Sequence, residues 1–126
     1  ERSHIRFGCM IDGSSLGFLT SMDMVSLFGN MIDNAMEAVR RLQDPEKAII
    51  NLTVRTQGHM VVIHCENYCV PGLVFENGLP VTSKEDTLFH GYGLKSMRFV
   101  AEKYGGTMTL QAEDEVFTTN ILLPIP

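Results

Sequence analysis

Apolar positions along the chain predict two helices. Between residues 22 and 43 they recur every three or four residues, the spacing of one helix face. We expect this stripe to face the core; its members are Val25, Phe28, Ile32, Ala35, Val39 and Leu42. Ser21 or Asp23 is the expected N-cap, and Pro45 lies just past the end. A similar stripe over residues 92–104 predicts a second helix, which Gly105-Gly106 should end.

Alternation of apolar and polar residues predicts the strands. Residues 3–11 alternate well enough for one strand. Residues 50–65 predict a hairpin that turns at Gln57-Gly58-His59, and residues 107–123 a second hairpin around residues 113–115. We therefore expect an α+β fold, a two-layer α/β sandwich with a mixed, mostly antiparallel sheet and helices on one face.

Composition limits the functions that this fold can serve. With 126 residues, 44% of them hydrophobic, the chain fits a single domain, residues 1–126, around one core. Its 15 acidic and 10 basic residues give a net charge of -5, and without a basic cluster nucleic acid is not an expected partner. No apolar run approaches the ~18 residues of a membrane span. The three cysteines match no common zinc pattern, so we expect reduced thiols that are mostly buried.

Polar side chains mark one face of the first helix. Asn30, Asn34 and Glu37 are spaced i, i+4, i+7 and therefore share a face, roughly opposite the predicted apolar stripe. Asparagine competes with the backbone for hydrogen bonds, so each one in mid-helix costs a few tenths of a kcal/mol. This face is either a ligand site or simply solvated.

A glycine-containing segment opens the second helix. It reads His90-Gly91-Tyr92-Gly93-Leu94-Lys95. Glycines allow a ligand to approach the backbone, and the first N–H groups of a helix favour negative charge, so this entry suits phosphate. Before it, residues 68–91 include Pro71, Gly72, Gly78 and Pro80 and show little periodicity, which is typical of a functional lid.

The two motifs, in this order, resemble the nucleotide-binding domain of the GHKL superfamily and specifically the catalytic domain of sensor histidine kinases. Residues 30–35 are similar to its N box, and residues 91–94 to its G2 box, with the lid at about 68–91 between them. Thr82-Ser83-Lys84 followed by His90-Gly91-Tyr92-Gly93-Leu94 is closest to the quorum-sensing receptor kinases. The resemblance spans nearly the whole chain and implies the GHKL ATPase type of sandwich.

The resemblance implies a role for each motif residue, with ATP and Mg²⁺ as cofactors. Asn34 would give its carbonyl oxygen to Mg²⁺, and Asn30 would contact phosphate or metal-bound water. Glu37, a further turn along, would belong to the ATP site. The segment from His90 to Lys95 would hold the phosphates, with Lys84 or Lys95 neutralising charge and Thr82 nearby. The catalytic residues would be Asn30 and Asn34.

The sequence departs from the family at the adenine site. The family's G1 box has an Asp followed by glycines, but here the strand ends Cys65-Glu66-Asn67-Tyr68-Cys69-Val70. Either Glu66 or Asn67 would contact the adenine amino group, with the side chains of Tyr68 and Val70 where glycines would allow the base to approach. This predicts weak adenine recognition.

A second difference concerns the reaction. Hydrolytic members of the superfamily use a Glu as general base at the position of Asn30, and a neutral amide cannot take a proton near pH 7. The resemblance therefore implies phosphoryl transfer to a His on a separate dimerisation domain, in a homodimer that signals to a response regulator. The alternatives are an anti-sigma-type serine kinase and a nucleotide-sensing pseudo-kinase. We expect a cytoplasmic piece of a membrane-anchored bacterial receptor kinase, without direct membrane contact of its own.

Overall fold

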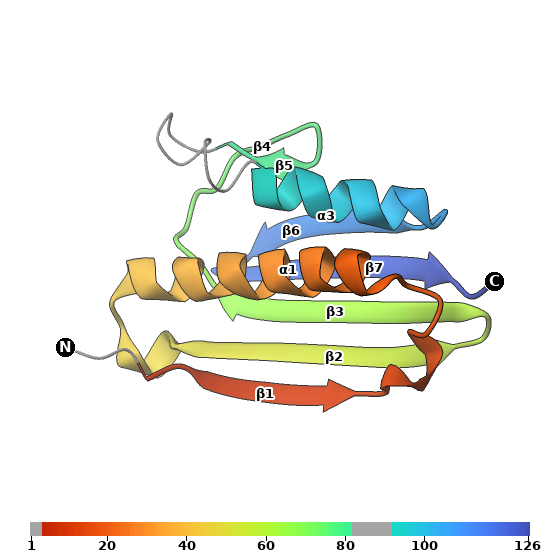
Figure 1. Cartoon of the computed structure of the whole chain (residues 1–126). Coiled ribbons are helices and arrows are strands. Elements are labelled where there is room, and N and C mark those ends of the chain that lie inside the picture. Colours follow the sequence, from red (N-terminus) through yellow and green to blue (C-terminus); the bar gives the residue numbers. More distant parts are fainter. Residues whose placement is uncertain (1–3, 82–91) are drawn as a thin grey trace.

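Five strands form one mixed sheet in the computed structural model, which describes residues 4–81 and 92–126 (Figure 1). The strand order is β1-β2-β3-β7-β6. β1 pairs with β2 in parallel and all other neighbours are antiparallel. The strands span β1 Arg6–Ile11, β2 Ile49–Gln57, β3 Met60–Tyr68, β6 Thr107–Glu113 and β7 Val116–Pro124. The predicted strand and both predicted hairpins are confirmed.

Two α-helices among the described residues, α1 (Ser21–Leu42) and α3 (Tyr92–Lys103), cover one face of this sheet (Figure 1). This confirms the α+β sandwich. The two short 3-10 turns are η1 (Gly13–Ser15) and η2 (Pro45–Lys47). The helices pack side by side and run antiparallel (Figure 1). Their directions are evident from the hydrogen bond between Asp23, near the start of α1, and Lys103, at the end of α3. The core lies between these helices and β2, β3 and β7.

The apolar stripe predicted for α1 is confirmed at Ala35 and Val39, and Phe28 is partly buried against the core, but the first half of the stripe is wrong. The buried residues of α1 are Leu27, Met31, Ala35 and Val39. Val25, which the prediction placed in the core, is 72% exposed. The first half of α1 is apolar at several neighbouring positions, and the structure buries Leu27 and Met31, which the prediction did not include. Periodicity alone does not show which of these positions faces the core.

Residues next to the helix termini explain where α1 begins and where α3 ends. The N-cap of α1 is Thr20, not Ser21 or Asp23 as predicted: its hydroxyl accepts from the Asp23 N–H at 3.1 Å. α3 ends as predicted at Gly105, whose φ of 78° is the left-handed conformation that glycine adopts at low cost. The Gly106 N–H then bonds the carbonyl of Ala101 at 2.8 Å, which closes a Schellman motif.

The segment predicted as an irregular lid is partly ordered. β3 extends to Tyr68, and a small hairpin of β4 (Phe75–Glu76) and β5 (Leu79–Pro80) follows. Asn77 and Gly78 make its turn with positive φ angles, a common hairpin chemistry that the prediction overlooked. Residues 82–91, the rest of the predicted lid, lie outside the described residues.

The cysteines are free thiols, but only two are buried as predicted. Cys65 and Cys69 are buried, whereas Cys9 lies exposed on the edge strand β1. Burial raises the pKa of the Cys65 thiol to about 12. Within the part of the chain that the structure describes, neither helix combines the length and apolar character needed to cross a bilayer.

Candidate functional site

The two sequence motifs meet where the N-terminus of α3 contacts the middle of α1. Gly93, the second residue of α3, is buried against Asn30 and Asn34. A Cβ atom at this position would lie 3.3 Å from Asn30 Oδ1, and 3.5 Å and 3.6 Å from Asn34 Nδ2 and Oδ1. The contact with Asn30 is tight, so a side chain at position 93 would shift the Asn30 oxygen, whereas the contacts with Asn34 are ordinary van der Waals contacts. The first N–H groups of α3 have no partner within the helix and lie at the same place.

Both asparagines lie against Gly93, and hydrogen bonds engage the amide nitrogen of each. The Asn30 amide donates to the Ser26 carbonyl at 2.7 Å, and the Asn34 amide donates to the Met97 sulfur at 3.8 Å. Because each amide nitrogen is engaged, each carbonyl oxygen can accept or coordinate another group. Mg²⁺ is commonly held by one or two protein oxygens together with substrate phosphates and water, and this pair of oxygens fits that requirement.

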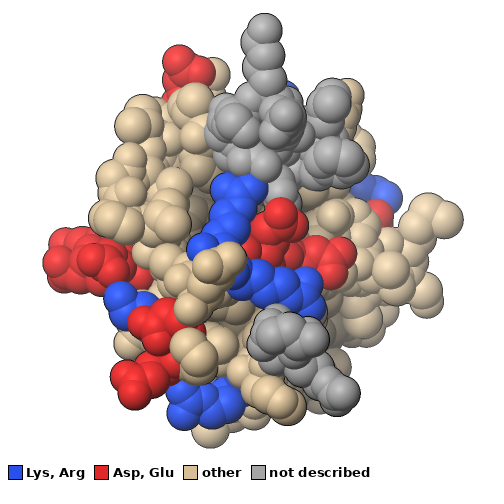
Figure 2. Space-filling view, turned by 90° about the vertical axis from the view of Figure 1, so that its left-hand side faces the viewer, with Lys and Arg blue, Asp and Glu red and all other residues tan. Residues whose placement is uncertain are grey.

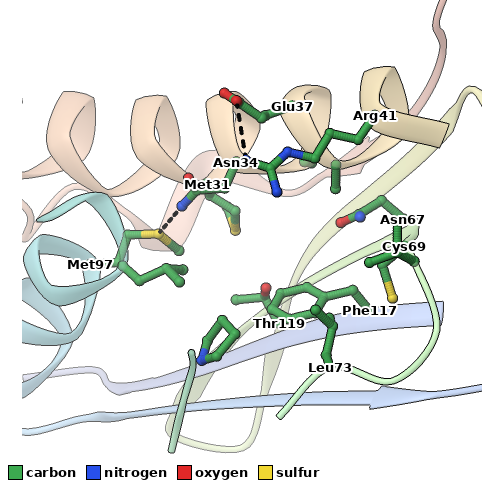
Figure 3. A pocket seen from close by; sticks show the side chains of 15 residues that line it. Met31, Asn34, Glu37, Arg41, Asn67, Cys69, Leu73, Met97, Phe117 and Thr119 are labelled. Atoms are coloured by element: carbon green, nitrogen blue, oxygen red, sulfur yellow. Dashed lines mark hydrogen bonds and ion pairs between the residues drawn. The ribbon is translucent and has the colours of Figure 1, made fainter. Parts of the chain in front are cut away.

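A cavity of about 110 Å³ lies next to this contact, beneath the second half of α1 (Figure 3). It exists because the helices differ in length: α1 has 22 residues and α3 has 12, or about 33 Å against about 18 Å. α1 therefore continues past the start of α3. The lining residues are Met31, Asn34, Ala35, Glu37, Ala38, Arg41, Asn67, Cys69, Val70, Leu73, Pro80, Leu94, Met97, Phe117 and Thr119.

The structure shows that Asn67, and not Glu66, lies at the cavity. Asn67 is 5% exposed, has the same strand parity as the buried Ile63 and Cys65, and lines the cavity. Its amide donates to the Tyr68 carbonyl at 2.9 Å, which leaves its oxygen to accept. Glu66 has the opposite parity, which places it on the face of the sheet away from the helices.

Two neighbours of Asn67 point away from the cavity for the same reason. Glu66 bonds His64 there at 3.0 Å, and the Tyr68 ring lies beneath Lys47, whose nitrogen is 5.8 Å from the ring centroid. The prediction that the Tyr68 side chain obstructs the base is therefore wrong. Val70 does line the cavity, as does Cys69.

Sequence reasoning missed the part of the cavity that β7 supplies. Thr119 is 5% exposed and Phe117 half-buried, and they pair with Cys65 and Asn67 across the β3–β7 ladder. Their parity with the apolar Ile121 and Leu123 indicated the inner face, but only the strand pairing reveals which residues they meet. Cys69 was also missed; burial raises the pKa of its thiol, which keeps it protonated near neutral pH.

The other predicted site residues divide into four groups. Leu94 is buried in the cavity wall. Glu37 lies at the rim, 3.9 Å from Arg41 in an ion pair. Tyr92 and Lys95 are exposed on α3 and are not among the cavity residues. Thr82, Lys84, His90 and Gly91 lie outside the described residues.

Charge at this end of the molecule is mixed. Figure 2 views the end toward which the second half of α1 extends, and basic and acidic side chains lie side by side there. Besides Glu37 and Arg41, Lys47 pairs with Glu115 at 3.1 Å, and this bond raises the pKa of Lys47. An anionic ligand would therefore be held by local groups, not by a broad positive surface.

Comparison with known proteins agrees with this architecture. The sequence profile of the GHKL domain matches residues 19–124. The sensor histidine kinase DpiB of Escherichia coli strain K12 is 32% identical over 102 residues, which are 76% of this chain and 18% of DpiB. The chain thus spans less than a fifth of that relative.

Solved histidine kinases have the same fold. The catalytic domain of ThkA superposes with a TM-score of 0.67 at 17% identity, over 96% of this chain and 80% of that one. AdeS of Acinetobacter baumannii gives 0.60 at 15% identity, over 95% and 55%. The family match, the shared fold and the meeting of the two motifs lead to one identification: the chain belongs to the GHKL domain family, as a catalytic domain of the histidine-kinase type.

Proposed function

We propose that this domain binds Mg-ATP at the contact between α1 and α3 and in the adjoining cavity. The observation that carries the proposal is the meeting of the Asn30 and Asn34 side-chain amides with Gly93, at the start of α3. Asn34 coordinates Mg²⁺, Asn30 contacts phosphate or metal-bound water, and the N–H groups of the first turn of α3 hold phosphate oxygens. Lys84 or Lys95 neutralises phosphate charge.

The adenine base occupies the cavity in this proposal. Asn67 accepts a hydrogen bond from the adenine amino group, and Thr119 lies in the same wall. Support comes from the burial of both side chains: Asn67 and Thr119 are the buried polar residues of the described chain, and both line this space. Buried polar groups are retained where they find partners.

The γ-phosphoryl group passes to a histidine on a separate dimerisation domain of the full-length protein. Asn30 supports transfer over hydrolysis, because its amide cannot take a proton from water. The isolated domain should therefore release phosphate negligibly. Appreciable release that is lost in Asn30→Ala would favour a hydrolytic enzyme instead.

We extend the proposal to the cellular setting of the domain. Residues 1–126 act as one catalytic domain of a membrane-anchored bacterial receptor kinase, on its cytoplasmic side, in a homodimer that signals to a response regulator. Membership of the quorum-sensing subgroup rests on the Thr82-Ser83-Lys84 and His90–Leu94 patterns and on the absence of glycines from Tyr68 to Val70. DpiB, the sensor kinase compared above, supports the broader class only.

Ligand-induced stabilisation tests nucleotide binding. The melting temperature is measured with ATP or ADP, each with Mg²⁺ and with EDTA. A ligand at 100 times its dissociation constant should stabilise the fold by about 2.7 kcal/mol. We expect stabilisation by Mg-ATP that EDTA greatly reduces; no stabilisation at any concentration up to about 10 mM, well above the range of affinity expected below, would contradict the proposal.

Asn34→Ala identifies the metal ligand. Losing even an outer-shell partner of a metal commonly costs about 10- to 100-fold in metal affinity, so we expect at least this loss for Mg-ATP. Asp33→Ala is the matched control, since Asp33 is exposed and adjacent on the same helix. If Asn34→Ala unfolds the domain, or binds as Asp33→Ala does, Asn34 is not the ligand.

A second candidate, a nucleotide-sensing pseudo-kinase, is favoured by the missing glycines of the G1 box: the strand end from Tyr68 to Val70 has none, and the side chains of Cys69 and Val70 line the cavity. For either function we expect a dissociation constant of about 0.1 to 1 mM, or about -4 to -5.5 kcal/mol. Restoring the dimerisation domain in the same polypeptide separates the two. Phosphorylation of its histidine identifies a kinase, and binding without transfer identifies the sensor.

A further inference from the structure

Arg41 has a position on α1 that none of the assigned roles uses. Asn34, Ala38 and Arg41 are spaced i, i+4, i+7 and all line the cavity. Arg41 is seven residues from Asn34, or about 10 Å along the helix axis. A side chain so far from the metal ligand lies beside the base end of a bound nucleotide, not beside its phosphates.

The two side chains next to Arg41 leave room for a ring and hold the guanidinium beside it. Ala38, one turn earlier, contributes only a methyl group to the wall. Glu37 lies 3.9 Å from the guanidinium, and the Arg41 and Glu37 side chains are 43% and 48% exposed. Because this carboxylate offsets the charge of Arg41, the pair is poorly suited to attract phosphate but keeps a planar group at the rim.

The opposite wall is apolar. Figure 3 shows Arg41 on α1, and Asn67, Phe117 and Leu73 on the parts of the chain across the space; Asn67 and Phe117 are paired neighbours on β3 and β7. A flat heterocycle whose edge reaches Asn67 would thus have one face toward the apolar wall and the other toward Arg41. A guanidinium over an aromatic face is attracted by the ring, and its own plane can stack on it.

We propose that Arg41, oriented by Glu37, is a specificity-determining residue that stacks on the purine base of the bound nucleotide. The proposal rests on the nucleotide-binding function proposed above. Two side chains then recognise the base: Asn67 forms a hydrogen bond with its edge, and Arg41 stacks on its face. Recognition of the base is then separate from the metal and phosphate contacts of Asn34.

Calorimetric titration with Mg-ATP and with Mg-tripolyphosphate, which has no base, separates these contacts. Arg41→Ala should weaken Mg-ATP binding about five- to thirtyfold and leave tripolyphosphate unchanged. Asn34→Ala should weaken both ligands. Arg40→Ala is the matched control, because Arg40 precedes Arg41, is exposed and does not line the cavity.

Two more variants test the mechanism. Arg41→Lys keeps the charge but loses the planar group, so it should weaken Mg-ATP nearly as much as Arg41→Ala. Glu37→Gln should weaken it less, and should have no further effect once Arg41 is removed.

Three outcomes are distinguishable. If the wild type binds neither ligand, the proposed function itself is wrong. If the wild type binds Mg-ATP and Arg41→Ala binds it as Arg40→Ala does, the role of Arg41 is overturned. An equal loss for tripolyphosphate would overturn it as well, because Arg41 would then be a phosphate contact.

Discussion

The two ends of the helix layer differ in how their polar side chains are used. Where α1 begins and α3 ends, the polar groups bond one another: Asp23 accepts from Lys103 at 2.8 Å and from the Tyr104 hydroxyl at 2.5 Å. The Thr20 N–H donates to the same hydroxyl at 3.1 Å. Where α3 begins, the side-chain amides of Asn30 and Asn34 meet beside a cavity. We call these the closed end and the open end.

The two ends differ because α1 is longer than α3. α3 covers α1 from the closed end to Asn34, and beyond it α1 continues to Leu42 over the cavity. Partners within the fold satisfy the polar groups of the closed end, so these groups contribute to stability. The oxygens of the open end can bind an external partner, which is the arrangement a ligand site requires. We therefore expect mutations at the closed end to alter stability, and mutations at the open end to alter affinity.

Leu27→Ala should have the largest effect on stability. Leu27 is fully buried on α1, so the lost packing and the cavity left behind should cost about 2–5 kcal/mol in the free energy of unfolding. Chemical denaturation measures this. Val25→Ala is the control, since Val25 is 72% exposed and its truncation should stay within about 0.5 kcal/mol. Equal costs for the two would show that the buried stripe of α1 is misassigned.

Gly93→Ala, at the open end, should lower affinity and leave stability unchanged. The new methyl group would lie 3.3 Å from Asn30 Oδ1 and displace that oxygen, and it would occupy the space beside Asn34. We expect Mg-ATP affinity to fall at least about tenfold, or about 1.4 kcal/mol, without loss of stability. Gly29→Ala is the matched control: nothing lies within 4 Å of its new Cβ, so it should stabilise α1 by up to about 1 kcal/mol and bind normally. Normal binding by Gly93→Ala would contradict the site.

Thr20→Ala should lower stability by about 1 kcal/mol, because the Asp23 N–H loses its capping partner. Mg-ATP affinity should not change in this closed-end variant. Thr20→Ser keeps the capping oxygen and should recover most of the loss. A loss of affinity that exceeds the loss of stability would mean that the two ends are coupled.

Acid should weaken the closed end. The hydrogen bond from Lys103, followed by that from Tyr104, lowers the pKa of Asp23 below its usual 3.8. A depressed folded-state pKa gives stability that is present above pH 3.8 and is lost as the pH falls toward the folded value. Denaturation from about pH 5 to about pH 3 should therefore show a shallower decline in Asp23→Asn than in the wild type. Identical slopes would exclude this contribution.

The fold was largely predictable because its determinants are local. Alternation located both hairpins, and Gly105-Gly106 marked the end of α3. The error in the first half of the α1 stripe has a different cause. That half is apolar at several neighbouring positions, and the positions of α3 and the sheet, which lie far away in sequence, determine that Leu27 and Met31 are buried and Val25 is exposed.

Site residues were predictable from the sequence only where they belong to a short motif. Asn30, Asn34 and Gly93 were identified, and the structure brings them together. Phe117, Thr119 and Arg41 were missed, because their place in the cavity depends on the β3–β7 ladder and on the length of α1 beyond α3. Strand parity could have separated Asn67 from Glu66, since Asn67 alternates with the apolar Ile63 and Cys65 and Glu66 does not.

The most direct test of the open end as the nucleotide site is amide chemical-shift mapping of the wild-type domain during titration with Mg-ATP. The account predicts shifts in residues 30–41, 67–70, 93–97 and 117–119, and much smaller ones at Thr20, Asp23 and Lys103 of the closed end. Shifts concentrated at the closed end, or on the sheet face around His64 and Glu66, would contradict it.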